Sequence, residues 1–265
     1  MIFHSSIEPI YFLLPLVGLL IGLFGTMLGG GGGFFFLPIL ILLLGVPPQT
    51  AVITSLVATL PICFVGSLGH SRKGNIDFRV AALFAIAGIV GAFIGAGITS
   101  KISADNLKLS FGIYSILIAL NIAVVTWRKK RNDANKSEQQ KSSGLKKILK
   151  GSFYGFSAGT ITGTFGTSGT APILAGLFAM RMPLKLVIGT SLLVVLVNTV
   201  FAIGAHFLLG KIDLTLVYFL TAGSIIGALL GPKLLSKVKI DNSENRVKYL
   251  YAIVMVALGV LMIMS

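Results

Sequence analysis

Two glycine-rich stretches carry the residues whose types and spacing suggest chemistry. The first reads GTMLGGGGGFFFLP from residue 25, and the second reads GTITGTFGTSGTAP from residue 159. Each lies in an apolar region and should interrupt a helix, because glycine is a poor helix former. Interrupted backbone at membrane depth is tolerated only where it is buried in protein or lines a cavity. A short helix that begins after such a break points free N–H groups and its positive dipole end into that cavity, which favours an anion.

The predicted anion site consists of the glycines and hydroxyl side chains of both breaks, which are Gly29, Gly30, Gly31, Gly32, Gly33, Gly163, Thr164, Gly166, Thr167, Ser168, Gly169 and Thr170. The glycines also have a simpler explanation, which is close packing between helices. No acidic or basic residue is predicted in the middle of an apolar segment. An anion would therefore rest on N–H groups, helix dipoles and hydroxyls, and the missing carboxylates argue against a cation site.

Further polar residues lie in the long apolar segments that follow the breaks. Thr54 and Ser55 open one of these segments, and Thr190 and Ser191 open the other. Their hydroxyls either bond to the carbonyl four residues earlier or face the breaks and contact substrate. Asn198 is either a substrate contact or a hydrogen-bonded link between helices. All five residues belong to the candidate substrate site.

A second repeated unit, H-x3-G-x-I-D, runs from His70 to Asp77 and again from His206 to Asp213. It predicts a tight turn in which the aspartate caps the next helix. The alternative is that His70 and His206 gate the two mouths or carry protons there. The predicted topology places these histidines on opposite sides of the membrane. With Cys63 as the single cysteine, neither a metal site nor a cofactor is expected.

One enzyme signature competes with the transport interpretation. Residues 166–169 read GTSG, which fits the G-x-S-G motif of rhomboid intramembrane proteases, and His206 follows downstream. A nucleophilic Ser168 would need hydrogen-bond contact with that histidine. The same stretch aligns with the first glycine run, which has no serine, so a repeated structural element is favoured over an enzyme. The glycine run also lacks the G-K-[ST] ending of an ATP-binding loop.

Hydropathy indicates the elements that must position these residues. The chain has 265 residues, of which 55% are hydrophobic and 11% are charged; soluble domains carry about 25% charged residues. About ten apolar helical segments are predicted near 10–28, 34–45, 50–69, 78–98, 106–127, 151–165, 169–180, 186–208, 213–234 and 246–264. The fold class is therefore an all-α polytopic membrane protein. The net charge of +14 reflects basic residues flanking membrane spans, so no nucleic-acid partner is expected.

The sequence also contains an internal duplication. Residues 47–101 align without gaps with 183–237, and fifteen of the 55 pairs are identical, including histidines, aspartates and prolines. Upstream, an offset of 134 pairs Gly29 with Gly163 and Gly32 with Gly166. The predicted domains are a first membrane repeat over 1–127, a basic linker over 128–150 and a second repeat over 151–265.

Charge predicts the orientation of the repeats. If each broken pair enters and leaves the membrane on one side, each repeat has three full spans plus one hairpin, and the repeats are inverted. With the linker cytoplasmic, 19 Lys and Arg lie inside and three lie outside, namely Lys101, Lys108 and Lys211. The positive-inside rule favours this arrangement, with both termini outside.

The glycine run followed by proline, the later Thr-Ser and the duplicated halves resemble the TauE/SafE sulfite exporter-type permeases. By matching position, Gly29–Gly33, Pro38, Thr54 and Ser55 inherit the core motif of that family. The resemblance implies secondary transport of a small anion, such as sulfite or an organosulfonate, across the bacterial inner membrane. An anion channel is the alternative. The coupling ion, a proton or sodium, and the oligomeric state stay open.

Overall fold

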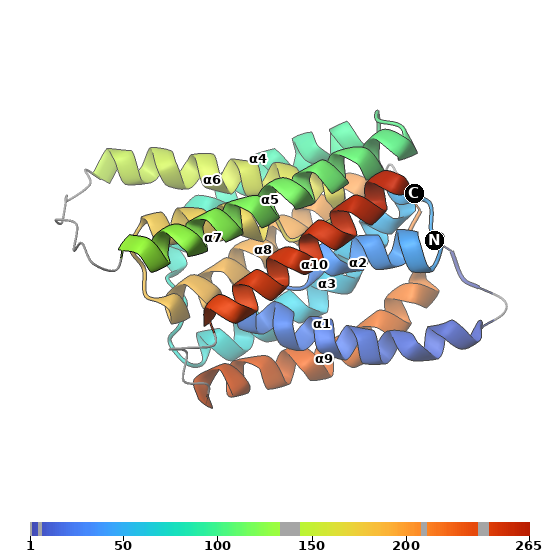
Figure 1. The fold of residues 1–265 in the computed structure, drawn as a ribbon, viewed down its shortest axis with the longest axis horizontal. Coiled ribbons are helices and arrows are strands. Elements are labelled where there is room, and N and C mark those ends of the chain that lie inside the picture. The colour runs from blue at the N-terminus through green and yellow to red at the C-terminus, as the bar shows by residue number, and fades with distance from the viewer. Residues whose placement is uncertain (1, 5–6, 133–143, 208–210, 238–243) are drawn as a thin grey trace. The chain divides into compact units, whose positions relative to one another are not determined.

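A computed structural model describes residues 2–4, 7–132, 144–207, 211–237 and 244–265 of the chain (Figure 1). These residues form ten α-helices and no β-strand, which confirms the all-α polytopic fold predicted from the sequence. Six described helices are long and apolar enough to cross a membrane. The fold divides into two compact units, of which unit 1 comprises Met1–Ile102 and Leu145–Lys237, and unit 2 comprises Ser103–Gly144 and Val238–Ser265.

Unit 1 contains both glycine-rich breaks. A short 3-10 segment, Pro9–Leu13, leads into α1, and a π-helical turn, Ile39–Leu43, follows α2. The helices of this unit are α1 (Leu14–Leu28), α2 (Gly33–Pro38), α3 (Pro48–Ser71), α4 (Phe78–Thr99), α6 (Gly144–Phe165), α7 (Thr170–Ala179), α8 (Leu184–Phe207) and α9 (Leu214–Lys237). The structure thus separates α1 from α2 and α6 from α7 at the two predicted breaks.

The centre of unit 1 is formed by α3 and α8. These are the most buried of the six candidate spans, with 67% and 61% of their most apolar window buried, against at most 44% for the others. The helix α3 packs against α8 and α9, and α8 packs against α4. Both central helices have 24 residues. They are the two helices that carry the Thr-Ser pairs, so those pairs lie in the protein interior.

Small residues bring two helix pairs into very close contact. On α1, a Cβ at Gly22 would meet the carbonyl of Ser224 on α9. On α6, a Cβ at Gly159 would meet the carbonyl of Gly88 on α4. Glycine is therefore needed at these positions for backbone approach, as in other membrane helix pairs. The first hairpin thus packs against a helix of the second predicted repeat, and the second hairpin packs against a helix of the first.

Unit 2 consists of α5 (Ala104–Asn132) and α10 (Glu244–Met264), which are the last helix of each predicted repeat. The two helices pack directly, since a Cβ at Gly112 would lie 2.6 Å from the carbonyl oxygen of Gly259. The Ser115 hydroxyl donates to the Met255 carbonyl at 2.6 Å, which satisfies a buried polar group. Residues 133–143 of the predicted linker lie outside the described residues.

Candidate substrate site

Each break is bounded by two glycines in the left-handed backbone region. In the first break these are Gly29 and Gly32, with φ of 76° and 77°. In the second they are Gly166 and Gly169, with φ of 63° and 52°. Residues with a Cβ rarely adopt this conformation, so the sequence requires glycine there. The second break begins three residues later than the sequence alignment suggests, because Gly163, the aligned partner of Gly29, is still helical.

The chain folds back on itself at both breaks. A Cβ at Gly32 would lie 3.1 Å from the backbone oxygen of Ile21, which is well back along α1. A Cβ at Gly169 would lie 2.7 Å from the hydroxyl of Thr162 on α6 and would also meet the carbonyl of Ala158. Each break therefore joins a longer helix and a short helix into a hairpin. This reversal is the premise of the inverted topology that the charge distribution predicts.

The two breaks are in direct contact. The Ser55 hydroxyl lies 3.2 Å from the Gly33 carbonyl oxygen and 2.9 Å from that of Gly166, so one side chain of α3 bonds to both breaks. The Thr170 hydroxyl, at the start of α7, lies 3.3 Å from the Gly30 carbonyl. Backbone atoms of one break are thus held by side chains that also contact the other. Of the residues predicted from the sequence, Gly30, Gly33, Ser55, Gly166 and Thr170 therefore lie together.

The space beside Gly33 is polar. A Cβ at this glycine would lie 2.8 Å from the hydroxyl of Thr59 and 3.1 Å from the backbone nitrogen of Ser168. The hydroxyls of Thr59 and Thr167 are buried and have no hydrogen-bond partner among the described residues. Sequence reasoning missed Thr59. It lies one turn after Ser55 on the same face of α3, and that spacing is a signal that could have identified it.

The two residues of each Thr-Ser pair have different contacts. The serines face the breaks, since the Ser191 hydroxyl donates to the Gly29 carbonyl at 2.8 Å, as Ser55 does to the other carbonyls. The Thr54 hydroxyl accepts the N–H of Asp213 at 3.1 Å, and that of Thr190 accepts the N–H of Asp77 at 3.0 Å. Each central helix thus holds a turn that belongs to the other half of the chain.

The remaining candidates in the breaks contact neighbouring helices. A Cβ at Gly31 would lie 3.3 Å from a methyl group of Thr59, so this glycine also lies against α3. The Thr164 hydroxyl lies 3.4 Å from the Gly95 carbonyl of α4, which makes it a link between α6 and α4. Asn198 is fully buried on α8 and faces Gly88 of α4. Its amide has no hydrogen-bond partner in the part of the chain that the structure describes.

The histidines of the repeated unit are buried, with 1% of His70 and 2% of His206 exposed. His206 Nε2 lies 2.6 Å from the Gly163 carbonyl oxygen. The Ser168 hydroxyl instead accepts a hydrogen bond from Thr170 at 2.7 Å. Among the hydrogen bonds of the described residues, none joins the serine to the histidine as a protease would require.

The aspartates of the repeated unit cap the next helix, as the sequence predicts. Asp77 Oδ1 accepts the N–H groups of Arg79 and Val80 at 3.1 and 3.0 Å. Asp213 Oδ1 accepts the N–H of Leu216 at 3.1 Å. The two aspartates therefore cap their helices alike, and Gly210 of the second turn lies outside the described residues.

Comparison with known families agrees with this architecture. Residues 14–262 match the family described as sulfite exporter TauE/SafE. The chain belongs to this family. This TauE/SafE protein is also similar to probable membrane transporters along most of its length.

One relative is a probable membrane transporter protein of Xylella fastidiosa (strain 9a5c), 31% identical over 221 residues that cover 82% of this chain and 80% of the relative. Another is the probable membrane transporter protein YdhB of Bacillus subtilis (strain 168), 30% identical over 226 residues that cover 83% and 89%. No solved structure gives a significant match. The family and the names of these relatives indicate a membrane transporter.

Proposed function

We propose that this TauE/SafE protein moves a small anion across the membrane by alternating access, with the two breaks as its substrate site. The observation that carries the proposal is the contact between the breaks, in which the Ser55 hydroxyl bonds to a carbonyl of each. The unpartnered Thr59 hydroxyl lies beside Gly33, and Thr167 of the second break also has a buried, unpartnered hydroxyl. Unpartnered buried polar groups destabilise a protein, and a ligand that supplies partners offsets that cost.

The available groups favour an anion over a cation. Helix α7 begins at Thr170, and its N-cap Gly169 has no side chain that could bond the first N–H groups. These N–H groups, the Ser168 N–H and the free hydroxyls are donors, and neither break contains an acidic residue. A sulfur-containing oxyanion, sulfite or an organosulfonate, is the substrate class that membership of the family supports.

The two close-packed helix pairs are the rigid units that would move during alternating access. Glycines hold α1 against α9 and α6 against α4 at backbone contact. Tightly packed pairs move as units more readily than they deform internally. We therefore expect the pair α1–α9 and the pair α4–α6 to move alternately against the central helices α3 and α8, exposing the breaks first to one side and then to the other.

Transport in proteoliposomes tests this function. Uptake of labelled sulfite or methanesulfonate should saturate with concentration and should accelerate when the same anion is preloaded inside. Protein-free liposomes provide the control. A flux that stays linear in concentration would support an anion channel in place of a carrier. Absence of flux for sulfite, sulfonates and other small oxyanions would contradict anion transport altogether.

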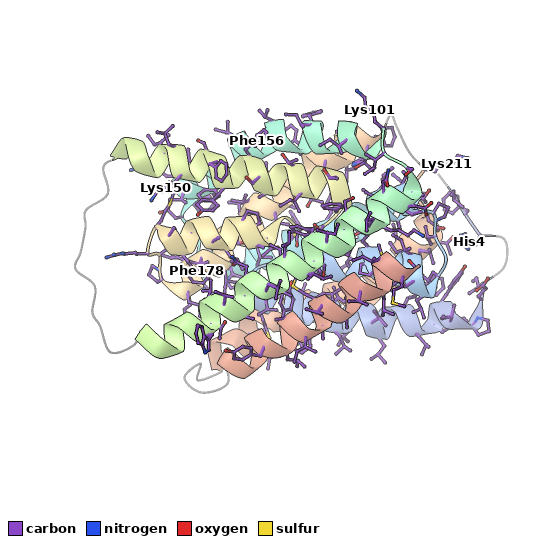
Figure 2. The ribbon with its side chains drawn as sticks, turned by 45° about the horizontal axis from the view of Figure 1, so that its top comes forward. His4, Lys101, Lys150, Phe156, Phe178 and Lys211 are labelled. Atoms are coloured by element: carbon purple, nitrogen blue, oxygen red, sulfur yellow. The ribbon has the colours of Figure 1, made fainter. Side chains whose placement is uncertain are left out.

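The orientation in the bacterial inner membrane is proposed with the linker in the cytoplasm and both termini outside. Figure 2 supports this arrangement, since Lys101 and Lys211 lie at one end of unit 1 and Lys150 at the other. In a Cys63→Ser background, a membrane-impermeant thiol reagent should label Lys211→Cys in intact cells and should label Lys150→Cys only after lysis. The opposite pattern would reverse the orientation.

A further inference from the structure

Residues 2–4, which precede α1, are hydrogen-bonded to the turn that precedes α9. The N–H of Ile2 donates to the Ile212 carbonyl at 2.7 Å, and the N–H of Leu214 donates to the Ile2 carbonyl at 3.0 Å. The N–H of His4 donates to the Thr215 hydroxyl at 2.9 Å. This strap, residues 2–4, is held by backbone groups on both sides of Asp213.

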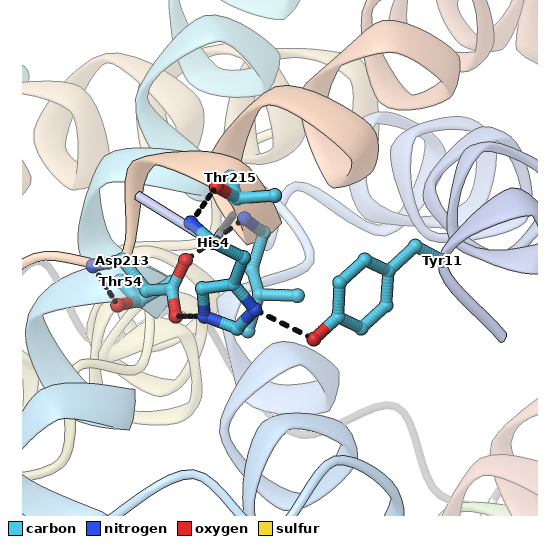
Figure 3. Close-up of polar contacts among 6 residues, drawn as sticks. His4, Tyr11, Thr54, Asp213 and Thr215 are labelled. Atoms are coloured by element: carbon cyan, nitrogen blue, oxygen red, sulfur yellow. Dashed lines mark hydrogen bonds and ion pairs between the residues drawn. The ribbon is translucent and has the colours of Figure 1, made fainter. Parts of the chain in front are cut away.

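A histidine–aspartate pair closes the strap (Figure 3). His4 Nε2 lies 2.7 Å from Asp213 Oδ2, and His4 Nδ1 lies 2.7 Å from the Tyr11 hydroxyl. The aspartate side chain is 4% exposed and the histidine side chain is 28% exposed. A buried carboxylate therefore has a partner that solvent protons reach. Histidine is the side chain whose charge changes in the physiological pH range.

The pair is linked to the substrate site through α3. The N–H of Asp213 donates to the Thr54 hydroxyl at 3.1 Å. The next residue, Ser55, bonds to Gly33 and Gly166 in the two breaks. Two neighbouring residues of α3, Thr54 and Ser55, thus connect the His4–Asp213 pair to both breaks. A movement of the strap can therefore reach the candidate substrate site through α3.

Among the described residues, the matching turn in the first half has no such pair. Asp77 holds the same place before α4, and its N–H bonds to Thr190 as that of Asp213 bonds to Thr54. Its carboxylate accepts only the N–H groups of Arg79 and Val80 among the hydrogen bonds of the described residues. In the part of the chain that the structure describes, a histidine partner is therefore present at Asp213 and absent at Asp77.

We propose that the His4–Asp213 pair is a proton-operated clasp that controls opening of the transporter at the end where Lys211 lies. With the histidine charged and the aspartate ionised, the bond is charge-assisted and the strap is held. Loss of the histidine proton leaves a bond of about half the strength. Deprotonation of His4 therefore loosens the clasp.

Other ionisable groups around the pair do not replace it. Tyr11 and Glu8 come from the segment before α1, and Lys211 lies two residues before the aspartate. The tyrosine hydroxyl can donate to a neutral ring or accept from a charged one, so it serves both states. Glu8 and Lys211 are exposed, and water screens their charges.

Hydrogen exchange tests the clasp without reference to transport. On protein in nanodiscs, exchange corrected for its intrinsic pH dependence is compared between a peptide spanning 211–216 and the matched peptide spanning 75–80. In the wild type, protection of 211–216 should fall by about tenfold from pH 5.5 to pH 8, since a bond change of about 1.4 kcal/mol is tenfold. Protection of 75–80 should stay constant, and it reports that the protein is folded.

The variant His4→Gln retains a hydrogen-bond donor but cannot be charged. It should show the low protection of 211–216 at both pH values. An equal pH response in wild type and H4Q, or an equal response in both peptides, would overturn the clasp.

The control of transport by the clasp rests on the proposed function, so it is measured in a separate flux experiment. Methanesulfonate stays ionised over this range, so its flux in proteoliposomes should rise with pH in the wild type and stay level in H4Q. Identical pH profiles would overturn the gating role. Absence of flux in both proteins would contradict the proposed function instead, and the exchange experiment would still decide the clasp.

Discussion

The two breaks begin and end with the same backbone conformation and differ in their side chains. Both are bounded by left-handed glycines and both turn the chain back on itself. The first break brings only glycines between its helices, whereas the second brings Thr167 and Ser168 and leads into Thr170. Carbonyls of the first break accept hydroxyls from elsewhere, namely Ser191 at Gly29 and Thr170 at Gly30.

This difference indicates that the two breaks would contribute different chemical groups to the candidate site. The first break supplies carbonyls, and its lack of side chains lets Thr59 and Ile21 approach its backbone closely. The second supplies hydroxyls and the start of a ten-residue helix. Neither is complete alone, because the polar space beside Gly33 is lined by Ser168 of the other break and Thr59 of α3. Selectivity should therefore depend more on the second break, and access more on the first.

The largest expected effect comes from filling the first break. In Gly33→Ala, the new methyl group would lie 2.8 Å from the Thr59 hydroxyl and 3.1 Å from the Ser168 nitrogen. Misplacing such groups should reduce anion flux by about 100-fold. The matched control is Gly204→Ala on α8, where a Cβ has open space. Equal flux in the two variants, measured in proteoliposomes, would contradict a site at this position.

A smaller effect is expected from the two serines, and it should be unequal. Ser55 bonds to both breaks, whereas Ser191 bonds to the first break through Gly29. Ser55→Ala should lower the free energy of unfolding by about 1–3 kcal/mol because it leaves buried carbonyls without this donor. Thermal unfolding and flux of Ser55→Ala and Ser191→Ala should both rank the first as more damaging. The reverse order would show that Ser55 does not join the breaks.

The smallest effect is expected from the two threonines, and it should be equal. Thr54 and Thr190 each accept one N–H, from Asp213 and Asp77. Replacing either with valine keeps the shape and should cost about 1 kcal/mol of unfolding free energy. Thermal unfolding of T54V and T190V measures the two losses. A large difference between them would contradict the matched roles of the two turns.

The sequence predicted the helices, the two breaks and most of the residues in the candidate site. Hydropathy and glycine clusters are local signals, and they locate elements well in a membrane protein. The exchange of hairpins between halves, with α1 on α9 and α6 on α4, could not be predicted, because apolar faces rich in small residues do not specify their partner.

Two polar contacts were also beyond the sequence. His4 stands alone in a region without a motif, and its partner Asp213 is distant in the chain. The Thr-Ser pairs were recognised as candidates, but the opposite tasks of Thr54 and Ser55 follow from their orientations on α3. Two adjacent residues on a helix point about 100° apart, so a motif alone does not say which neighbour each one contacts.

Substrate protection of cysteines in both breaks tests the central claim most directly. In a Cys63→Ser background, Gly30→Cys probes the first break and Ser168→Cys the second, with Gly97→Cys on α4 as a control in open space. Labelling by a small neutral thiol reagent is followed as the transported anion is added. Two breaks that form one site predict slower labelling at both probes, with the same half-maximal anion concentration and no change at the control. Protection at one break alone, or at neither, would contradict a shared site.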